Sequence, residues 1–213
     1  MSRFRSLCTT LRRRGLAGAR ELLRENFCAT RVFHRLRCDP TRPPVTAQIE
    51  CPAALTFARG SLEELRRWRA EPGRGPVLAH FFEDEAHGLD WFYLARWNGE
   101  VACIQWIATA DRPTSVGDLR LCPDEVEFRN VCTLPEFRRR GIFAQMLRFA
   151  LADVGANGIN AVWAHVKVEN RASLTALLAA GFREIERVTV HRVLGCDSIK
   201  RRPAVGVASN CKV

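Results

Sequence analysis

The 213-residue sequence is poor in lysine and tyrosine. Lys167, Lys200 and Lys212 are the only lysines among 33 basic residues, and Tyr93 is the only tyrosine. A GC-rich genome produces such an excess of arginine, so the net charge of +10 is weak evidence for a nucleic-acid partner. The most basic segment, residues 1–37, also has few aromatic side chains to stack on bases. We therefore expect no sequence-specific nucleic-acid binding.

Long apolar runs, paired cysteines and metal-ligand clusters are missing as well. No apolar run reaches the roughly 18–20 residues that span a bilayer, so no transmembrane helix is expected. The nine cysteines are odd in number and include no Cys-x-x-Cys pair, which favours reduced thiols in the cytoplasm over a disulfide framework. The five histidines do not combine with cysteines at zinc-ligand spacing, so no metal is predicted.

The positive charge is concentrated at the N-terminus. Residues 1–50 contain eleven arginines and four acids, which accounts for +7 of the net charge of +10. Phe4, Leu7 and Leu11 recur at helical spacing and predict an amphipathic helix. Residues 1–37 would then dock on the rest of the chain or make a peripheral contact with an anionic membrane. A mitochondrial presequence has a similar composition and remains an alternative.

The remaining sequence has the composition of one folded domain, with 47% hydrophobic and 26% charged residues. The predicted division is a basic N-terminal extension at 1–50, made of a helix and an irregular segment, a domain at 51–195, and a C-terminal tail at 196–213.

Strand and helix signals alternate along the chain. Short strands are expected at Arg31–Leu36, Val45–Ile49 and Leu55–Ala58. The capping box Ser61-x-x-Glu64 begins a helix, and a second short helix is expected near Val77–Glu83. Next comes the clearest hairpin signal, two apolar runs joined by Asn98-Gly99, which suits a type I′ turn. Its predicted strands are Trp91–Arg96 and Val101–Ala108.

The second half continues the alternation. A strand at Glu125–Thr133, a helix from Gly141 and a strand at Ala161–Val166 are expected. A helix at Ser173–Ala180 and two closing strands, Glu184–Val188 and Thr189–Leu194, follow. This order predicts an α/β fold of the mixed α+β kind, with a central twisted mixed sheet flanked by helices and not a doubly wound one.

The segment Val131–Ala144, VCTLPEFRRRGIFA, contains the main chemical signal. A strand runs into a turn of three arginines and a glycine, and a helix follows directly. Main-chain N–H groups and the positive end of the helix then point at one place. Because Gly141 has no Cβ, an anionic group can approach the main chain there. The segment is suited to a pyrophosphate.

The sequence here resembles the GNAT superfamily of acetyltransferases. Their acetyl-CoA signature is matched by Arg138-x-x-Gly141, although Phe143 stands where Gly or Ala is usual. A second family element is matched by Asn170-x-x-Ser173 followed by Gly181-Phe182. The resemblance covers roughly residues 53–194, and it implies a GNAT-like acyl-CoA N-acyltransferase fold.

The resemblance also implies the donor and its contacts. Acetyl-CoA would pair its pantetheine arm with the end of the strand and its pyrophosphate with the turn. The acetyl group would pass by direct attack to a primary amine of a small molecule or peptide, without a metal. The implied contact residues are Val131, Cys132, Thr133, Arg138, Arg139, Arg140, Gly141, Ile142, Phe143, Ala144, Asn170 and Ser173.

Two residues are candidates for the catalytic base. Glu127 lies eleven residues before Arg138, where several family members have a base, and strand alternation places it on one face with Arg129 and Val131. A glutamate that is exposed or paired with Arg129 is the alternative. His165 on the facing strand is the second candidate, and a packed, hydrogen-bonded histidine is its alternative.

Other features leave the activity less defined. Leu177 occupies the position at which the family usually has a tyrosine as general acid, so a non-catalytic acyl-CoA-binding module or an anionic-surface binder remains an alternative. A covalent intermediate on Cys132 is disfavoured, because direct transfer is the usual route of the family. Glu83–Glu85 and the aromatic run Trp91–Tyr93 would frame a cationic acceptor, with Trp97 and Trp106 beside them, unless these aromatics belong to the core. The acceptor, the acyl length and the oligomeric state, a homodimer included, stay open.

Overall fold

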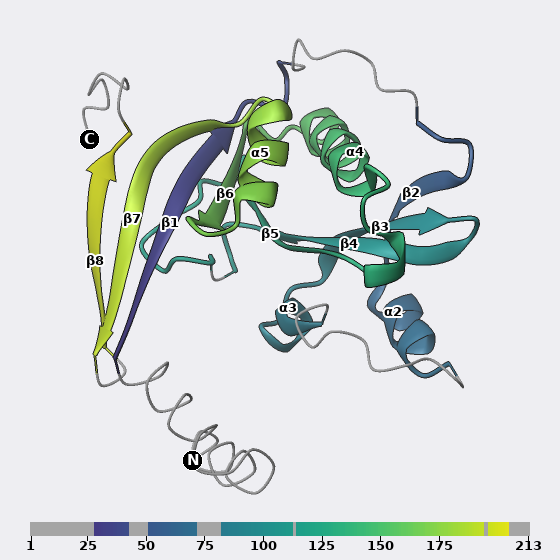
Figure 1. Cartoon of the computed structure of the whole chain (residues 1–213), viewed down its shortest axis with the longest axis horizontal. Coiled ribbons are helices and arrows are strands. Elements are labelled where there is room, and N and C mark those ends of the chain that lie inside the picture. Colours follow the sequence, from purple (N-terminus) through teal and green to yellow (C-terminus); the bar gives the residue numbers. More distant parts are fainter. Residues whose placement is uncertain (1–27, 43–50, 72–81, 113, 194–195, 205–213) are drawn as a thin grey trace, which may run out of the picture.

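The computed structural model describes residues 28–42, 51–71, 82–112, 114–193 and 196–204. They form one eight-stranded sheet with the order β2-β3-β4-β5-β6-β1-β7-β8 (Figure 1). Neighbouring strands are antiparallel except for the parallel pair β5 and β6. The predicted mixed sheet flanked by helices is therefore confirmed.

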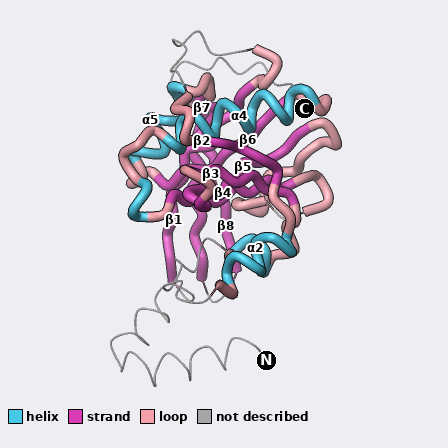
Figure 2. The backbone as a smooth tube through the Cα atoms, turned by 90° about the vertical axis from the view of Figure 1, so that its right-hand side faces the viewer, coloured by secondary structure: helices cyan, strands magenta, loops and turns pink. Residues whose placement is uncertain are grey.

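The helices lie on both faces of this sheet. Helices α4 and α5 cover one face, and α2 and α3 lie on the other (Figures 1 and 2). The strands are β1 Cys28–Cys38, β2 Leu55–Arg59, β3 Trp91–Trp97, β4 Glu100–Ala108, β5 Glu125–Thr133, β6 Ala161–Lys167, β7 Arg183–Val193 and β8 Cys196–Pro203. The helices are α2 Leu62–Arg69, α3 Glu83–Ala86, α4 Ile142–Ala156 and α5 Arg171–Ala179, and a 3₁₀ turn, η2, spans Pro135–Phe137.

Local sequence signals account for several of these boundaries. Asn98 and Gly99 have φ values of 50° and 85°, so both central positions of the β3–β4 turn are left-handed, as the Asn-Gly pair predicts. The Ser61 hydroxyl accepts a hydrogen bond from the main-chain N–H of Glu64 at 3.2 Å and caps α2. Gly141, with φ of 72°, is the N-cap of α4.

Strand β1 does not fit the predicted division at residue 50. It is eleven residues long and lies inside the sheet, antiparallel to both β6 and β7. Its residues His34, Leu36 and Cys38 are buried. The partners of the strand lie more than 100 residues away in the sequence, so no local signal places it in the sheet. The predicted extension and domain therefore share the sheet.

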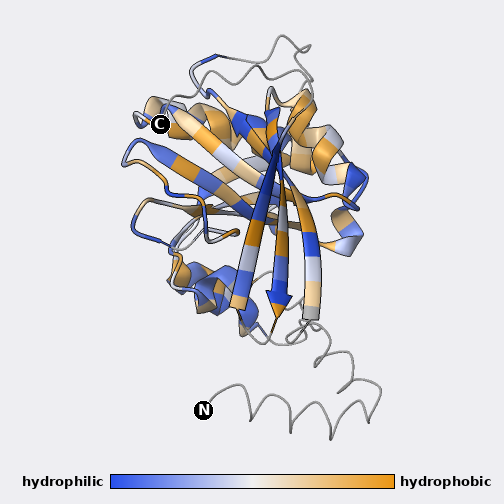
Figure 3. Cartoon of the chain, turned by 90° about the vertical axis from the view of Figure 1, so that its left-hand side faces the viewer, coloured by the Kyte–Doolittle hydropathy of each residue, from blue (hydrophilic) through white to orange (hydrophobic). Residues whose placement is uncertain are grey.

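The C-terminal end differs from its prediction too. The two predicted closing strands are one continuous strand, β7, because Val188 and Thr189 are β-branched and continue the ladder. Residues 196–203 are β8, an edge strand paired with β7, where a frayed tail was expected. Seen from this edge, hydrophilic and hydrophobic residues alternate along the strands (Figure 3).

Some predictions cannot be compared with the structure. The N-terminal helix and the strand Val45–Ile49 lie outside the described residues, as does most of the short helix Val77–Glu83. In the part of the chain that is described, no helix has the length and apolar composition that spanning a bilayer requires.

Candidate active site

A β-bulge in β5 shapes the site. On β4, Ile104 and Trp106 are two residues apart, but their partners Cys132 and Arg129 on β5 are three apart. Asn130 adopts a φ of 30°, a left-handed value that asparagine tolerates better than most residues. The extra residue shifts the alternation, so that Arg129 shares a face with Cys132. The predicted alternation through Val131 is therefore wrong beyond Arg129.

The side chain of Gln105 stabilises the main chain beside this bulge. Its Nε2 donates to the carbonyl oxygen of Arg129 at 2.7 Å and to that of Trp106 at 2.9 Å. Gln105 is only 2% exposed, so these bonds satisfy main-chain groups that the bulge would leave without ladder partners.

Strands β5 and β6 separate beyond the bulge. Their parallel pairing runs from Glu125–Ala161 to Phe128–Ala164, whereas β5 continues to Thr133 and β6 to Lys167. Two adjoining cavities open where the strands diverge. We call them the loop cavity, beside the turn at 138–141, and the strand cavity, between the two strands.

The loop cavity has a volume of about 660 Å³ and surrounds the start of α4. Arg139 and Gly141 have φ values of 63° and 72°, and these left-handed residues turn the chain sharply into the helix. The Gly141 N-cap makes no side-chain capping bond, so the first N–H groups of α4 are open to an anion. A Cβ at Gly141 would meet nothing within 4 Å, which leaves room for a ligand. The geometry fits the pyrophosphate of acetyl-CoA. The predicted contact residues that line this cavity are Val131, Cys132, Thr133, Arg138, Arg139, Gly141, Ile142, Phe143, Ala144, Asn170 and Ser173.

Arg140 is the exception among the predicted contacts. Its guanidinium lies 5.1 Å from the ring centre of Trp97 and 5.7 Å from that of Phe137, and Arg140 does not line the loop cavity. Arg138 donates from Nε to the carbonyl oxygen of Thr133 at 3.1 Å. The triplet is thus divided: Arg138 and Arg139 face the cavity, whereas Arg140 packs against the β3–β4 hairpin and η2.

Asn170 and Ser173 form the opposite wall. The Asn170 side chain caps α5 by accepting a hydrogen bond from the main-chain N–H of Ser173 at 3.1 Å. Both residues line the loop cavity and the strand cavity, as do Val131 and Phe143. These four shared residues mark the place where the two cavities meet.

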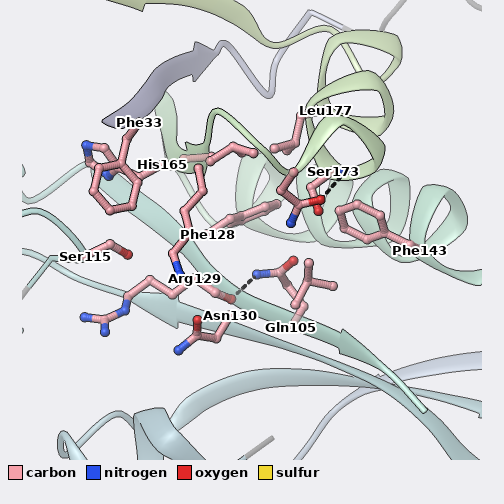
Figure 4. Close-up of a pocket in the computed structure, with 15 residues that line it drawn as sticks. Phe33, Gln105, Ser115, Phe128, Arg129, Asn130, Phe143, His165, Ser173 and Leu177 are labelled. Carbon is pink, nitrogen blue, oxygen red and sulfur yellow. Dashed lines mark hydrogen bonds between the residues drawn. The ribbon is translucent and has the colours of Figure 1, made fainter. Parts of the chain in front are cut away.

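The strand cavity has a volume of about 480 Å³. In Figure 4, Ser173, Phe143 and Leu177 lie toward one end, and Phe33, His165 and Ser115 lie toward the other. The Ser173 end joins the loop cavity, so a thioester whose pyrophosphate lay in the loop cavity would enter here. The opposite end is then available to an acceptor.

Glu127 and His165, the two candidates for the base, are in direct contact. His165 Nδ1 lies 2.6 Å from Glu127 Oε1, and both side chains are 0% exposed. The second Glu127 oxygen accepts a hydrogen bond from the main-chain N–H of Ser115 at 2.7 Å. His165 as a whole residue is partly exposed, so the atoms it presents to solvent belong to its main chain. Because Ser115 and His165 line the strand cavity, the Glu127 carboxylate lies directly behind the wall.

Arg35 determines the tautomer of His165. Its Nε donates to His165 Nε2 at 2.7 Å. Because a guanidinium has no acceptor, His165 Nε2 must be unprotonated and its Nδ1 must carry the hydrogen. His165 therefore donates to Glu127, and both oxygens of the carboxylate accept hydrogen bonds.

Arg35 is itself held by two carboxylates. It donates to Glu186 Oε1 at 2.5 Å and to Asp118 Oδ1, and Asp118 Oδ2 accepts from Arg201 Nε at 2.7 Å. Arg35 is only 3% exposed, and the two partly buried carboxylates compensate its charge. Strands β1, β7 and β8 thereby contribute to the network behind the strand cavity.

Other candidates for chemistry lie elsewhere or are poorly activated. Burial raises the pKa of the Cys132 thiol, which disfavours the thiolate that covalent catalysis needs. The Tyr93 hydroxyl donates to Asp153 on α4 at 2.6 Å, and burial raises the pKa of Tyr93. Leu177 lines the strand cavity without a polar group, so no tyrosine acid is present there.

The predicted acidic and aromatic frame for a cationic acceptor is not found. Asp84 is 0% exposed and lies 2.8 Å from the guanidinium of Arg129, and Glu85 pairs with Arg66 at 2.9 Å. Phe92, Tyr93 and Trp106 are fully buried core residues. None of these acidic and aromatic residues lines either cavity.

Several residues of this site were not predicted from the sequence, among them Arg35, Gln105, Ser115 and Lys167. Arg35 lies on a strand outside the family motifs, and Ser115 contributes only a main-chain N–H. Gln105, in the apolar run of β4, is the one residue for which a signal existed, because a glutamine in a buried strand needs hydrogen-bond partners.

The comparison with protein families matches these features. The profile of the Acetyltransferase (GNAT) family covers residues 60–182, more than half of the chain. The chain belongs to the GNAT acetyltransferase family. Members of this family use acetyl-CoA as the acyl donor.

Individual relatives are distant. The chain is 24% identical over 104 residues to the [ribosomal protein bS18]-alanine N-acetyltransferase of Salmonella typhimurium, a match that covers 48% of this chain and 70% of that protein.

Solved structures of GNAT proteins share the fold. A GCN5-related N-acetyltransferase from Sphaerobacter thermophilus superposes with a TM-score of 0.53 at 18% identity, covering 91% of this chain and 59% of that one. The glucosamine N-acetyltransferase region of a fungal multi-domain β-N-acetylglucosaminidase gives a TM-score of 0.60 at 16% identity, covering 82% of this chain and 22% of that one. The present chain thus spans less than two thirds of either solved chain.

Proposed function

We propose that this GNAT protein transfers the acetyl group of acetyl-CoA to a primary amine in one direct step. The observation that supports this most is the junction of the two cavities at Val131, Phe143, Asn170 and Ser173, with a buried carboxylate–imidazole pair behind the wall. The loop cavity would hold the pyrophosphate, and the strand cavity would bring the thioester and the amine together.

In this proposal, acetyl-CoA supplies a thioester carbon that the amine nitrogen attacks. The C–N bond forms, the C–S bond breaks, and CoA leaves as its thiolate. The amine proton passes through a water beside Ser115 to Glu127, whose charge is stabilised by His165 and by the Ser115 N–H. Solvent protonates the thiolate, because Leu177 offers no hydroxyl.

Glu127 is the proposed base, and His165 is its hydrogen-bonded partner. Both nitrogens of His165 already make hydrogen bonds, so the imidazole is not free to accept a further proton. The buried carboxylate also distinguishes this proposal from a non-catalytic acyl-CoA-binding module. A module that only binds acyl-CoA would gain nothing from burying a carboxylate next to the thioester.

The test is acetyl-CoA binding measured by calorimetry. Gly141→Asp places a carboxylate where the pyrophosphate should lie, and it should abolish micromolar binding. Gly158→Asp is the matched control, because Gly158 also has a positive φ and open space around it but lies at the far end of α4. Equal binding by both variants, or none by folded wild type, would refute the proposed donor site.

A further inference from the structure

The strand cavity has basic but no acidic side chains in its wall. Arg129 and Lys167 are its two cationic lining residues, and no Asp or Glu lines it among the residues that the structure describes. The remaining polar wall consists mainly of neutral side chains, such as Gln105, Ser115 and Asn130. A ligand at this end therefore meets a positive wall.

Apart from the proposed base Glu127, which lies behind the wall, the carboxylates near the cavity are occupied by basic partners. Asp84 pairs with Arg129, and Glu85 with Arg66. Asp118 is bound by two arginines. The segment 72–81 between α2 and α3 contains no Asp or Glu in its sequence, so it cannot supply an acid wherever it lies.

Lys167 differs from the other basic residues near the site. It is the last residue of β6, it is exposed, and its Cα is the register partner of Phe33 on β1. It makes no ion pair with any described residue. Its neighbour Phe33 lies at the end of the strand cavity away from Ser173 (Figure 4). The carbonyl oxygen of Lys167 accepts a hydrogen bond from the main-chain N–H of Asn170 at 2.9 Å, so Lys167 borders the strand cavity between the junction and the acceptor end.

We propose that the acceptor is a small amine that bears a carboxylate, and that Lys167 is the residue that selects it. This inference rests on the proposed acetyltransferase function and adds the class of acceptor. Lys167 would bind the carboxylate with its charge, and the Arg129 guanidinium, whose charge is compensated by Asp84, would add hydrogen-bond donors from the facing strand.

The same charges prepare the nucleophile. Only a neutral amine can attack the thioester, and nearby cations lower the pKa of a bound ammonium group. A positive wall thus attracts the carboxylate of the acceptor and favours the neutral form of its amine. Polyamines and amino sugars with several positive charges would be repelled by this wall.

CoA is also anionic, so its phosphates are another potential partner for Lys167. Lys167 lines only the strand cavity, however, whereas the loop cavity has its own cations, Arg138 and Arg139. The two sources make different predictions. A lysine that binds CoA phosphates affects the affinity for acetyl-CoA, and one that binds the acceptor affects only the acceptor.

The experiment compares matched acceptors on the full-length protein. CoA release would be measured with the common L-amino acids, with the corresponding L-amino acid amides, and with spermidine. We expect the best amino acid to exceed its own amide at least tenfold in kcat/KM, and spermidine to be inactive. An amide or spermidine that matches or exceeds the carboxylates, or a lack of acetylation across all three sets, would overturn the proposal.

Two variants assign the preference to one side chain. Lys167→Glu should lower kcat/KM for the best amino acid at least tenfold, mainly through KM, and change kcat/KM for its amide much less. Lys200→Glu is the matched control, because Lys200 is an exposed lysine of the edge strand β8 that lines neither cavity. If Lys167→Glu lowers kcat/KM equally for the amino acid and for its amide, the role of Lys167 is refuted. It is also refuted if Lys200→Glu lowers kcat/KM for the amino acid as much as Lys167→Glu does.

Calorimetry separates this proposal from the underlying function. If wild type and Lys167→Glu bind acetyl-CoA equally but show no preference for carboxylates, the acceptor class is wrong and the donor site stands. If Lys167→Glu instead weakens acetyl-CoA binding, Lys167 serves the donor and the acceptor proposal fails. Absence of acetyl-CoA binding by folded wild type would refute the proposed function itself.

Discussion

Arg35 and His165 are 130 residues apart in the sequence, yet Arg35 Nε donates to His165 Nε2 at 2.7 Å. The bond joins β1 to β6. Strand β1 lies outside the matched family segment 60–182, whereas β6 borders the strand cavity. It keeps the proton of His165 on the nitrogen that faces Glu127. The protonation pattern behind the cavity therefore depends on a residue that no family motif contains.

The first prediction concerns this arginine. Arg35→Met should allow His165 to populate the other tautomer, which ¹⁵N NMR of the imidazole detects directly. Because the change removes the guanidinium that pairs with Glu186 and, together with Arg201, with Asp118, it should also cost about 1–3 kcal/mol of unfolding free energy. Arg37→Met is the control, since Arg37 is exposed on the same strand and lies over the Trp163 ring.

Activity and tautomer should change together. Arg35→Lys keeps a donor and a charge, so a folded lysine variant with the wild-type tautomer should retain more kcat than the methionine variant. An unchanged Nδ1–H tautomer in Arg35→Met would contradict the assignment, whatever happens to stability.

The second prediction concerns the proposed base. Glu127→Gln should lower kcat by about 100-fold or more, in line with the usual contribution of a general base, and leave acetyl-CoA affinity unchanged. His165 and the Ser115 N–H both donate to Glu127, and an amide has only one acceptor oxygen, so stability should fall by about 1–3 kcal/mol.

Asp153→Asn controls for that loss of stability. Asp153 accepts the buried Tyr93 hydroxyl bond on α4 and does not line either cavity. A loss of kcat in Asp153→Asn as large as that in Glu127→Gln would mean that destabilisation, and not the loss of a base, explains the result.

The third prediction divides the arginine triplet. Arg138→Ala and Arg139→Ala should each weaken acetyl-CoA binding about 10- to 150-fold, the effect of a lost charge-assisted hydrogen bond. Arg140→Ala should affect binding less and lower thermal stability instead, because Arg140 packs on Trp97 and Phe137. Calorimetry would measure acetyl-CoA affinity and thermal unfolding would measure stability for the three variants. A larger loss of affinity in Arg140→Ala than in Arg138→Ala and Arg139→Ala would contradict the prediction.

The fourth prediction concerns the thiol at the junction of β5 and the loop cavity. Since burial raises the pKa of Cys132, less thiolate is present at neutral pH than for an ordinary cysteine, and alkylation should accelerate as pH rises into the alkaline range. Site-resolved mass spectrometry should show exposed Cys122 reacting first and acetyl-CoA protecting Cys132. Cys132→Ala should keep kcat within a few-fold, whereas a trapped acyl-Cys132 would contradict direct transfer.

The fifth prediction concerns β1. A chain of residues 28–213 retains every described strand and should fold, whereas a chain of residues 51–213 lacks the strand between β6 and β7. The shorter chain should lose cooperative thermal unfolding, because two long ladders lose their common partner. Cooperative unfolding of the 51–213 chain at the wild-type temperature would show that β1 is dispensable.

Local signals predicted much of the site. The hairpin follows from Asn98-Gly99, and the loop cavity follows from the strand–turn–helix segment that ends at Gly141, because each depends on backbone preferences of neighbouring residues. The contact between Glu127 and His165 could be anticipated only as two separate candidates, since the parallel pairing of β5 with β6 is needed to bring them together.

Non-local features could not be predicted in the same way. The bulge at Asn130 breaks a period-two pattern that looks regular in the sequence, and the register with β4 is needed to detect it. The position of β1 depends on pairing with β6 and β7, which lie more than 100 residues later in the sequence, so no local signal placed it in the sheet. In the sequence Arg140 is indistinguishable from Arg138 and Arg139, and only its contact with Trp97 in the folded chain separates it from them.

The central position of β1 also affects how the chain is synthesised. Residues 28–38 leave the ribosome before the other described strands, but their second partner, β7, ends at Val193, some 155 residues later. At about 5–20 residues per second, β1 waits roughly 10–30 s before the sheet can close around it. During that interval its apolar residues are available to chaperones or to other nascent chains, because the ladder between β1 and β7 needs both strands.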